Sequence, residues 1–209
     1  MSMKKILFQG DSITDMYRVR ESEPYGGCGY ATLVAAQLGY DYPNEYEFIN
    51  RGIGGDRSID LLARIKRDMI NLKPDYMSIL VGVNDVWAEL DTGNGVSEEK
   101  YECYLSIIID EVLSALPDIK LMIMEPFVLK VPTASDRWEE FRREVEQRAA
   151  AAKRVAECHG IKFVPLIKKF DEALKSAPAE YWTVEGIHPT AAGHELIKRE
   201  WIKAFKEIK

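Results

Sequence analysis

The sequence predicts an α/β fold in which a five-stranded parallel sheet lies between two layers of helices. Two observations support this prediction. Short apolar runs typical of strands alternate with amphipathic helical stretches, and no internal repeat or low-complexity linker interrupts them. Strands that alternate with helices are joined by right-handed crossovers, which makes the sheet parallel and covers both of its faces. A chain of 209 residues can bury a good core, and we expect residues 1–209 to form one domain.

The expected strands and helices follow from local patterns of apolar and turn-forming residues. Strands are expected at the apolar run 6–8 and at 46–50, 76–81, 121–124 and 162–166. Helices are expected over 30–38 (ended by Gly39), from Ser58 as N-cap to Met69, from near Ser97 onward, and over 136–158, 167–174 and 190–208. The stretch 86–96 is expected to be irregular.

Charge and cysteine content limit the classes of partner and the compartment. The formal net charge of −6 argues against nucleic acid or an anionic membrane as the main partner. The N-terminal apolar run is too short for a signal peptide or a membrane span. Cys28, Cys103 and Cys158 form neither a disulfide framework nor a zinc pattern, and they suit a reducing compartment. We therefore expect a cytoplasmic protein, and its aromatic residues and the apolar face of the last helix are compatible with a homo-oligomer.

No motif predicts a cofactor or a metal. The chain has no Walker loop, and the glycine-rich stretch 52–55 is not a dinucleotide-binding fingerprint. The three histidines lack the spacing of metal ligands.

Polar segments follow the first three expected strands. Gly10-Asp11-Ser12 ends the first strand, the stretch 51–56 follows the second, and 82–85 follows the third. Gly-Asp-Ser alone is also compatible with an ordinary turn in which the serine caps a helix. However, the carboxyl ends of parallel strands meet at one edge of the sheet, so these segments are expected to lie close together. Their convergence predicts a site.

The side chains at that edge fit acyl transfer. Ser12 offers a hydroxyl that becomes a nucleophile once a base removes its proton. Gly54 offers a backbone N–H that no side chain covers, and Asn84 offers a carboxamide donor. Together these two donors are suited to an oxyanion hole, which stabilises the tetrahedral intermediate.

His188 is the best candidate for the base. Pro189 holds it in an extended conformation just before the last helix, and Glu185 stands three residues earlier, where its carboxylate can orient the imidazole. By contrast, His159 lies at an expected helix end, where capping explains it, and His194 is expected to be a surface or packing residue.

These motifs resemble the four marker blocks of the SGNH (GDSL-type) hydrolases. The blocks here are 10–14, Gly54, 82–85 and 185–189; they occur in the family order and span most of the chain. The resemblance implies a flavodoxin-like sheet of order 2-1-3-4-5. It also implies Ser12 as nucleophile, His188 as base, and the N–H groups of Ser12 and Gly54 with Asn84 as the oxyanion hole. The family usually has Asp where this chain has Glu185, so we expect a Ser-His-Glu triad.

The stretch from Asn84 to Trp87 and the chain length resemble members similar to acetylxylan esterases, which remove acetyl groups from sugars. A small-molecule ester, in particular an acetylated sugar, is therefore the expected substrate. Trp87 and Trp182 are expected to flank the site or, equally, to be packing residues. Asp15, Tyr17, Arg18 and Tyr25 are expected to shape the pocket, although Arg18 could equally be a surface charge. Asp11 is expected to bind substrate or, like Asp85, to hold its own loop through local hydrogen bonds.

Two other functions remain open at this stage. A lysophospholipase or thioesterase needs an acyl-chain pocket, which loops in this fold can form. A non-catalytic binding module on the same scaffold is also possible, because fold does not fix function. The complete set of Ser12, Asn84 and an acid-paired His188 favours the enzyme.

Overall fold

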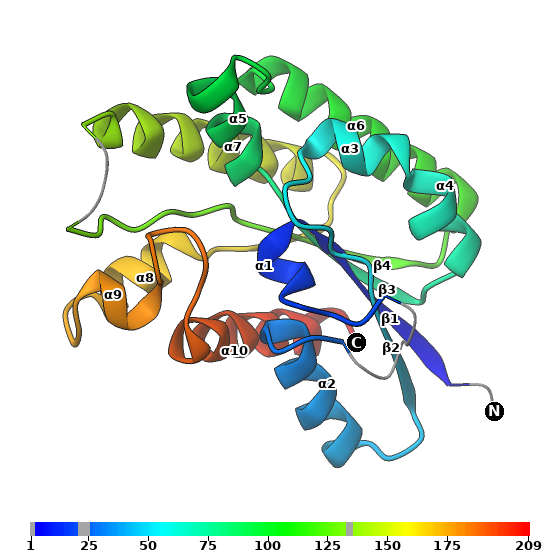
Figure 1. Cartoon of the computed structure of the whole chain (residues 1–209). Helices are drawn as coiled ribbons and strands as arrows, with labels where there is room; N and C mark the ends of the chain where they lie inside the picture. The colour runs from blue at the N-terminus through cyan, green and yellow to red at the C-terminus, as the bar shows by residue number, and fades with distance from the viewer. Residues whose placement is uncertain (1–2, 21–25, 133–135) are drawn as a thin grey trace.

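The computed structural model describes residues 3–20, 26–132 and 136–209 (Figure 1). At its centre lies a five-stranded sheet of order β2-β1-β3-β4-β5, in which neighbouring strands all run parallel. The strands are β1 (Lys4–Gly10), β2 (Tyr46–Asn50), β3 (Tyr76–Leu80), β4 (Lys120–Met124) and β5 (Lys162–Val164). The predicted fold class and strand order are confirmed.

Helices form a layer on each face of the sheet (Figure 1). One face packs against α2 (Tyr30–Asp41) and α10 (Ala191–Ile208). The other packs against α3 (Ser58–Ala63), α4 (Ile65–Asp68), α6 (Glu98–Ala115) and α7 (Trp138–Cys158). The remaining elements are the short helices α1 (Ser12–Asp15), α5 (Val83–Thr92), α8 (Ile167–Ala173) and α9 (Ala179–Trp182), and a 3-10 turn, η1 (Ile70–Leu72).

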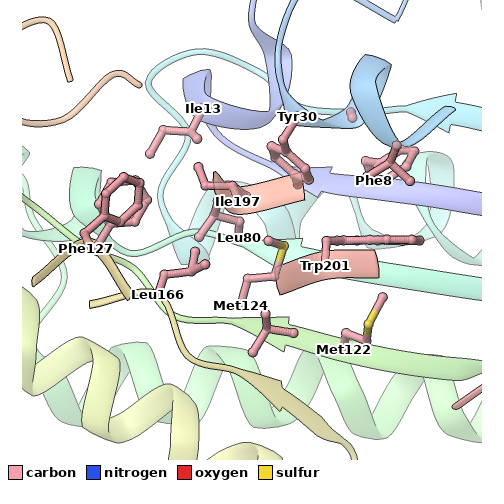
Figure 2. Close-up of a cluster of buried hydrophobic side chains, with 14 of the residues drawn as sticks. Phe8, Ile13, Tyr30, Leu80, Met122, Met124, Phe127, Leu166, Ile197 and Trp201 are labelled. Carbon is pink, nitrogen blue, oxygen red and sulfur yellow. The ribbon is translucent and has the colours of Figure 1, made fainter. Parts of the chain in front are cut away.

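Strand β1 is buried on both sides, as its apolar run predicts. Because side chains alternate between the faces of a strand, Ile6 and Phe8 join the core under α2 and α10, whereas Leu7 joins the opposite core. On the first side the ring of Trp201, from α10, lies 5.4 Å from that of Phe8 (Figure 2). Strand β1, which leads to Ser12, is therefore packed against a hydrophobic core on each face of the sheet.

The prediction of an irregular stretch at 86–96 is wrong, because most of it belongs to helix α5. Val83 and Val86 are buried and Leu90 packs against the same core, at helical spacing. Gly93 then ends the helix in the left-handed conformation, with φ of 67°. The Asn84-Asp85 motif therefore lies in the first turn of a helix.

Several helix boundaries also differ from the prediction. The single helix expected from Ser58 to Met69 is divided at Arg64 into α3 and α4. Helix α2 continues past Gly39 to Asp41, because the Leu38 carbonyl still accepts the N–H of Tyr42 at 2.8 Å. The N-cap of α3 is Arg57 instead of Ser58. The Ser58 hydroxyl donates to Asp85 of α5, a long-range contact that no local pattern reveals.

A buried hydrogen bond links α6 to the end of β3. The hydroxyl of Tyr101 donates to the carbonyl of Val81 at 3.0 Å, immediately before the turn that carries Asn84. We expect Tyr101→Phe to lower the free energy of unfolding by about 1–2 kcal/mol, since the buried carbonyl loses this donor. Urea unfolding followed by circular dichroism measures the change, with Tyr40→Phe, at an exposed tyrosine, as control. Equal stability of the Tyr101 and Tyr40 variants would contradict the expectation.

Candidate active site

The turn after β1 places Ser12 at the carboxyl edge of the sheet. Asp11 is the N-cap of α1, and its carboxylate accepts the N–H of Ile13 at 3.0 Å, so Ser12 becomes the first residue of the helix. A Cβ at Gly10 would lie 2.2 Å from the carbonyl oxygen of Leu80 in the neighbouring strand. Only glycine allows this close approach, which explains why the last residue of β1 is a glycine.

Ser12, His188 and Glu185 form a continuous chain of contacts, although 176 positions separate the first two. The Ser12 hydroxyl lies 2.7 Å from Nε2 of His188. Nδ1 of His188 contacts Oε1 of Glu185, which also accepts the backbone N–H of His188 at 3.2 Å. The carboxylate therefore favours the tautomer with hydrogen on Nδ1, leaving Nε2 free to accept the serine proton. The structure brings the three predicted catalytic residues together.

The loop that carries His188 is fixed from both sides. Gly186 has a φ of 95°, and a Cβ there would lie 2.4 Å from the carbonyl oxygen of Leu129. The Gly186 carbonyl in turn accepts the N–H of Leu129 at 2.8 Å. Within the loop, Val184 N–H donates to the His188 carbonyl at 2.8 Å. The base and its acid are thus held in place before any substrate arrives.

Four hydrogen-bond donors lie on the segments that follow β1, β2 and β3, and they differ in availability. The Asn84 amide donates one hydrogen to the Asp56 carbonyl at 3.1 Å and has a second one to offer. The N–H of Gly54 already donates to the Asp15 carboxylate at 3.1 Å. The N–H groups of Ser12 and Gly55 form no hydrogen bond within residues 3–20, 26–132 and 136–209. Gly55 has a φ of 86°, which favours glycine, and sequence reasoning did not single it out.

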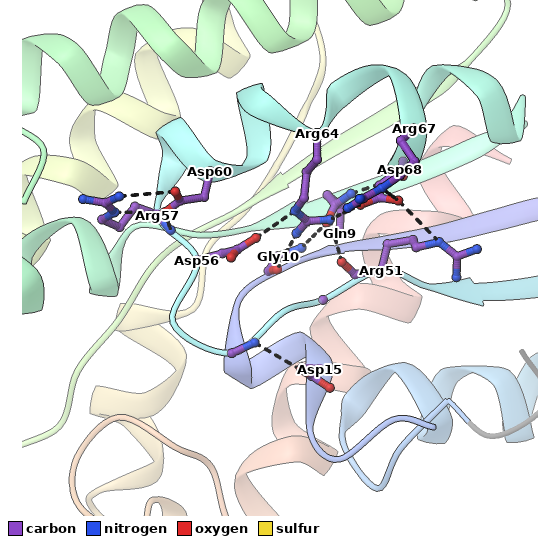
Figure 3. Close-up of polar contacts among 12 residues, drawn as sticks. Gln9, Gly10, Asp15, Arg51, Asp56, Arg57, Asp60, Arg64, Arg67 and Asp68 are labelled. Carbon is purple, nitrogen blue, oxygen red and sulfur yellow. Dashed lines mark hydrogen bonds and ion pairs between the residues drawn. The ribbon is translucent and has the colours of Figure 1, made fainter. Parts of the chain in front are cut away.

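Arg64 ties the turns after β1 and β2 together (Figure 3). Its guanidinium is almost fully buried and donates to the carbonyls of Gly10 at 3.3 Å and Arg51 at 2.9 Å. It also pairs with the carboxylates of Asp56 at 2.7 Å and Asp68 at 3.2 Å. Sequence reasoning missed this residue, because nothing in its local pattern distinguishes it from a surface arginine.

Two aspartates near the site are buried: Asp11 holds its own turn, as expected, whereas Asp85 bonds the start of α3 instead of its own loop. Asp85 accepts the N–H of Ser58 at 3.1 Å as well as the Ser58 hydroxyl, and burial raises its pKa to about 6. Burial likewise raises the pKa of Asp11 to about 7. Since the Asp11 side chain is only 1% exposed and bonded to Ile13, the structure does not place it against the pocket as a substrate ligand.

The open pocket beside Ser12 has a volume of about 540 Å³. Besides Ser12 and His188, it is lined by 15–18, Arg20, Gly54, Val184 and Glu185. Asp15, Tyr17 and Arg18 therefore lie where the sequence predicts, whereas Tyr25 falls outside the described residues.

The two predicted flanking tryptophans do not line this pocket. The Trp87 ring packs against Phe141, with centroids 5.8 Å apart, and is about half exposed. The Trp182 indole N–H donates to the Ala177 carbonyl at 3.3 Å. Both rings have packing partners outside this pocket.

Two of the three histidines have structural roles. His159, at the end of α7, bonds the Val155 carbonyl through Nδ1 at 2.8 Å. His194 is buried, and its Nδ1 accepts the N–H of Tyr30 at 3.1 Å, which anchors α10 to the start of α2. Burial, and to a lesser extent the nearby His188, lowers the pKa of His194 to about 4.

Neither a metal site nor a membrane span is evident in the structure. Within the described residues, no three His, Cys, Asp or Glu side chains cluster as metal ligands. None of the helices in that part of the chain is both long and apolar enough to cross a bilayer.

A serine, a histidine and a carboxylate in contact at the carboxyl edge of a 2-1-3-4-5 sheet define a carboxylic ester hydrolase of the SGNH type. The chain belongs to the GDSL-like Lipase/Acylhydrolase family, whose sequence pattern matches residues 8–196. It is 34% identical over 212 residues to an acetylxylan esterase of Geobacillus stearothermophilus, with 97% of this chain and 94% of the relative covered.

Solved structures agree with this membership. A protein of Parabacteroides merdae named as a GDSL-like lipase has a TM-score of 0.93 and 34% identity, covering 100% of this chain and 97% of its own. A variant of Axe2, the acetyl xylan esterase of G. stearothermophilus, has a TM-score of 0.87 and 32% identity, with 97% and 94% covered. Catalytic mutants of Axe2 replace a serine, an aspartate or a histidine by alanine. That aspartate precedes that histidine by three positions, as Glu185 precedes His188.

The depressed pKa of His194 predicts a pH dependence of stability. Between its unfolded value of 6.5 and its folded value of about 4, the unfolded chain binds the extra proton, so stability is lost as the pH falls through this window. We expect wild type to lose about 2–3 kcal/mol more than His194→Gln between pH 7 and pH 4.5. Urea unfolding at both pH values measures the difference. Parallel losses in the two proteins would contradict the assignment.

Proposed function

We propose that this chain is a serine esterase that removes short acyl groups, acetyl above all, from a carbohydrate or another small polar alcohol. The observation that carries the proposal is the Ser12–His188–Glu185 contact chain, which opens into a pocket whose lining includes the charged residues Asp15, Arg18 and Arg20. The relationship to an acetylxylan esterase over nearly the whole chain supports the same substrate class.

In the proposed reaction, the Ser12 hydroxyl oxygen attacks the ester carbonyl while Nε2 of His188 takes its proton. Glu185 stabilises the resulting imidazolium through Nδ1. When the tetrahedral intermediate collapses, the bond to the alcohol oxygen breaks and His188 returns the proton to that oxygen. Water, activated in turn by His188, then attacks the acyl-enzyme, and the free acid leaves Ser12 with its hydroxyl restored.

The oxyanion of the intermediate needs hydrogen-bond donors that do not already have an acceptor within the protein. The N–H of Ser12 and the second amide hydrogen of Asn84 meet this requirement. For the glycine donor we keep Gly54, which lines the pocket beside Ser12 and whose N–H donates to the Asp15 carboxylate at 3.1 Å. Gly54 takes this role only in a state in which Asp15 has moved away.

The pocket lining disfavours a long acyl chain. Arg18, Arg20, Asp15 and Glu185 bring charged groups to its walls, and burying a charge against an alkyl chain is costly. Hydroxyl groups of a sugar, by contrast, can bond to such side chains. A short acyl group on a polar alcohol fits better than a fatty acid ester.

We also propose a cytoplasmic location. Cys28, Cys103 and Cys158 are all exposed and unpaired, which suits a compartment that keeps thiols reduced.

The substrate class is tested by acetate release from an acetylated xylo-oligosaccharide, measured beside p-nitrophenyl acetate and p-nitrophenyl palmitate. We expect turnover of the two acetyl esters and at least about 100-fold lower kcat/KM on the palmitate, because a difference of about 3 kcal/mol in transition-state binding separates them. Preference for palmitate would assign the protein to the lipid esterases instead.

The triad is tested by single substitutions on p-nitrophenyl acetate. We expect Ser12→Ala and His188→Ala to reduce kcat by about 10⁶-fold, and Glu185→Gln to retain roughly 10–100-fold more activity, because the acid orients the base without taking its proton. Ser114→Ala and Glu180→Gln, at exposed positions, serve as matched controls. Unchanged turnover in Ser12→Ala would refute the serine mechanism, and equal losses in Glu185→Gln and His188→Ala would refute the orienting role.

A further inference from the structure

The turn that follows α1 has an unfavourable backbone conformation. Met16 has a φ of 32° and Tyr17 a φ of 59°, so two consecutive residues other than glycine lie in the left-handed region. Side chains with a Cβ are strained there, and such strain persists where the surroundings enforce it, often at functional sites. The turn begins directly after the helix that carries Ser12.

The contacts that hold this turn do not use the Tyr17 side chain. The Arg18 N–H donates to the Asp15 carbonyl at 2.9 Å, and the Cys28 N–H donates to the Met16 carbonyl at 2.9 Å. The Arg18 guanidinium donates to the Gly52 carbonyl at 2.7 Å. All of these bonds would form equally well with glycine at position 17, which adopts this conformation without strain.

The Tyr17 side chain gains little from folding. It is 84% exposed, so its ring keeps most of its contact with water, and it takes no part in the ring pairs of the described residues. The strained backbone at Tyr17 therefore destabilises the folded protein, and burial of the ring offsets little of that cost. Tyr17 nevertheless lines the pocket that holds Ser12 and His188.

We propose that Tyr17 determines specificity by stacking against the sugar ring that bears the acyl group. The C–H face of a pyranose is apolar, and a tyrosine ring can cover it with little loss of conformational freedom. Tyr17 is the aromatic member of a lining that is otherwise charged, small or aliphatic, so the charged neighbours are left to bond the sugar hydroxyls. This assignment rests on the proposed function, since it requires a sugar ester as substrate.

The test compares Tyr17→Gly with wild type on an acetylated xylo-oligosaccharide and on ethyl acetate, whose alcohol has no ring. We expect KM for the sugar ester to rise about 5- to 10-fold, the loss that a stacking contact of this kind represents. Activity on ethyl acetate should change less than about twofold. Removing the strained side chain should also raise Tm, by about 2–4 °C.

Two matched variants distinguish the loss of the aromatic ring at position 17 from other effects of substituting an exposed tyrosine. Tyr17→Phe keeps the ring and should restore KM for the sugar ester to within about twofold of wild type. Tyr40→Ala removes an equally exposed tyrosine from α2. It should change neither KM for the sugar ester nor the activity on ethyl acetate. Light scattering on each variant shows whether the oligomeric state changes.

Several results would overturn the assignment. A Tyr17→Gly variant with unchanged KM for the sugar ester, a lowered Tm, or equal losses on both esters would each refute it while leaving the esterase intact. A rise in KM accompanied by a changed molecular mass would assign Tyr17 to a subunit contact. If wild type shows no Ser12-dependent hydrolysis of the sugar ester, the proposed function fails, and this assignment fails with it.

Discussion

The active-site edge of the sheet depends on one buried cation. A guanidinium taken out of water is costly unless its donors are satisfied, and Arg64 meets this condition with two carbonyls and two carboxylates. The carbonyls belong to the turn that leads to Ser12 and to the turn that leads to the glycine donors. Asp56 extends the network, because its carbonyl accepts the Asn84 amide while its carboxylate pairs with Arg64. The segments that carry Ser12, Gly54 and Asn84, the proposed nucleophile and oxyanion donors, are thereby fixed relative to each other.

Close backbone packing complements this ion-pair network. A Cβ at Gly52 would lie 2.3 Å from the backbone nitrogen of Asp15, so the turn after β2 rests directly on α1. Asn50 reinforces the contact by donating to the Thr14 carbonyl at 2.7 Å and accepting the Gly52 N–H at 2.9 Å. The donors for an oxyanion are therefore positioned by the scaffold before substrate binds, which is the condition under which they lower a barrier most.

Sequence patterns predicted the sheet because each strand is apolar on both faces, a property of a few adjacent residues. They also singled out Ser12 and His188, which the structure brings into contact, since turns with glycine or proline at strand and helix ends are local signals. Helix α5 was missed because the Asn84-Asp85 motif was interpreted as a loop, although Val83, Val86 and Leu90 have helical spacing. The bonds of Gly54 and the contacts of Arg64 join residues distant in sequence. Local patterns carry no information on such pairs.

The carboxylates around Ser12 differ in environment, and this difference assigns their roles. Asp11 and Asp85 are buried, use their oxygens on the N-terminal groups of α1 and α3, and have raised pKa values that disfavour the charged form. The Glu185 side chain is 42% exposed and contacts His188. A base that becomes positive during the reaction is best stabilised by a partner that is already negative. The longer side chain of Glu185, in place of the usual aspartate, still reaches Nδ1, because the Gly186 turn brings the loop back on itself.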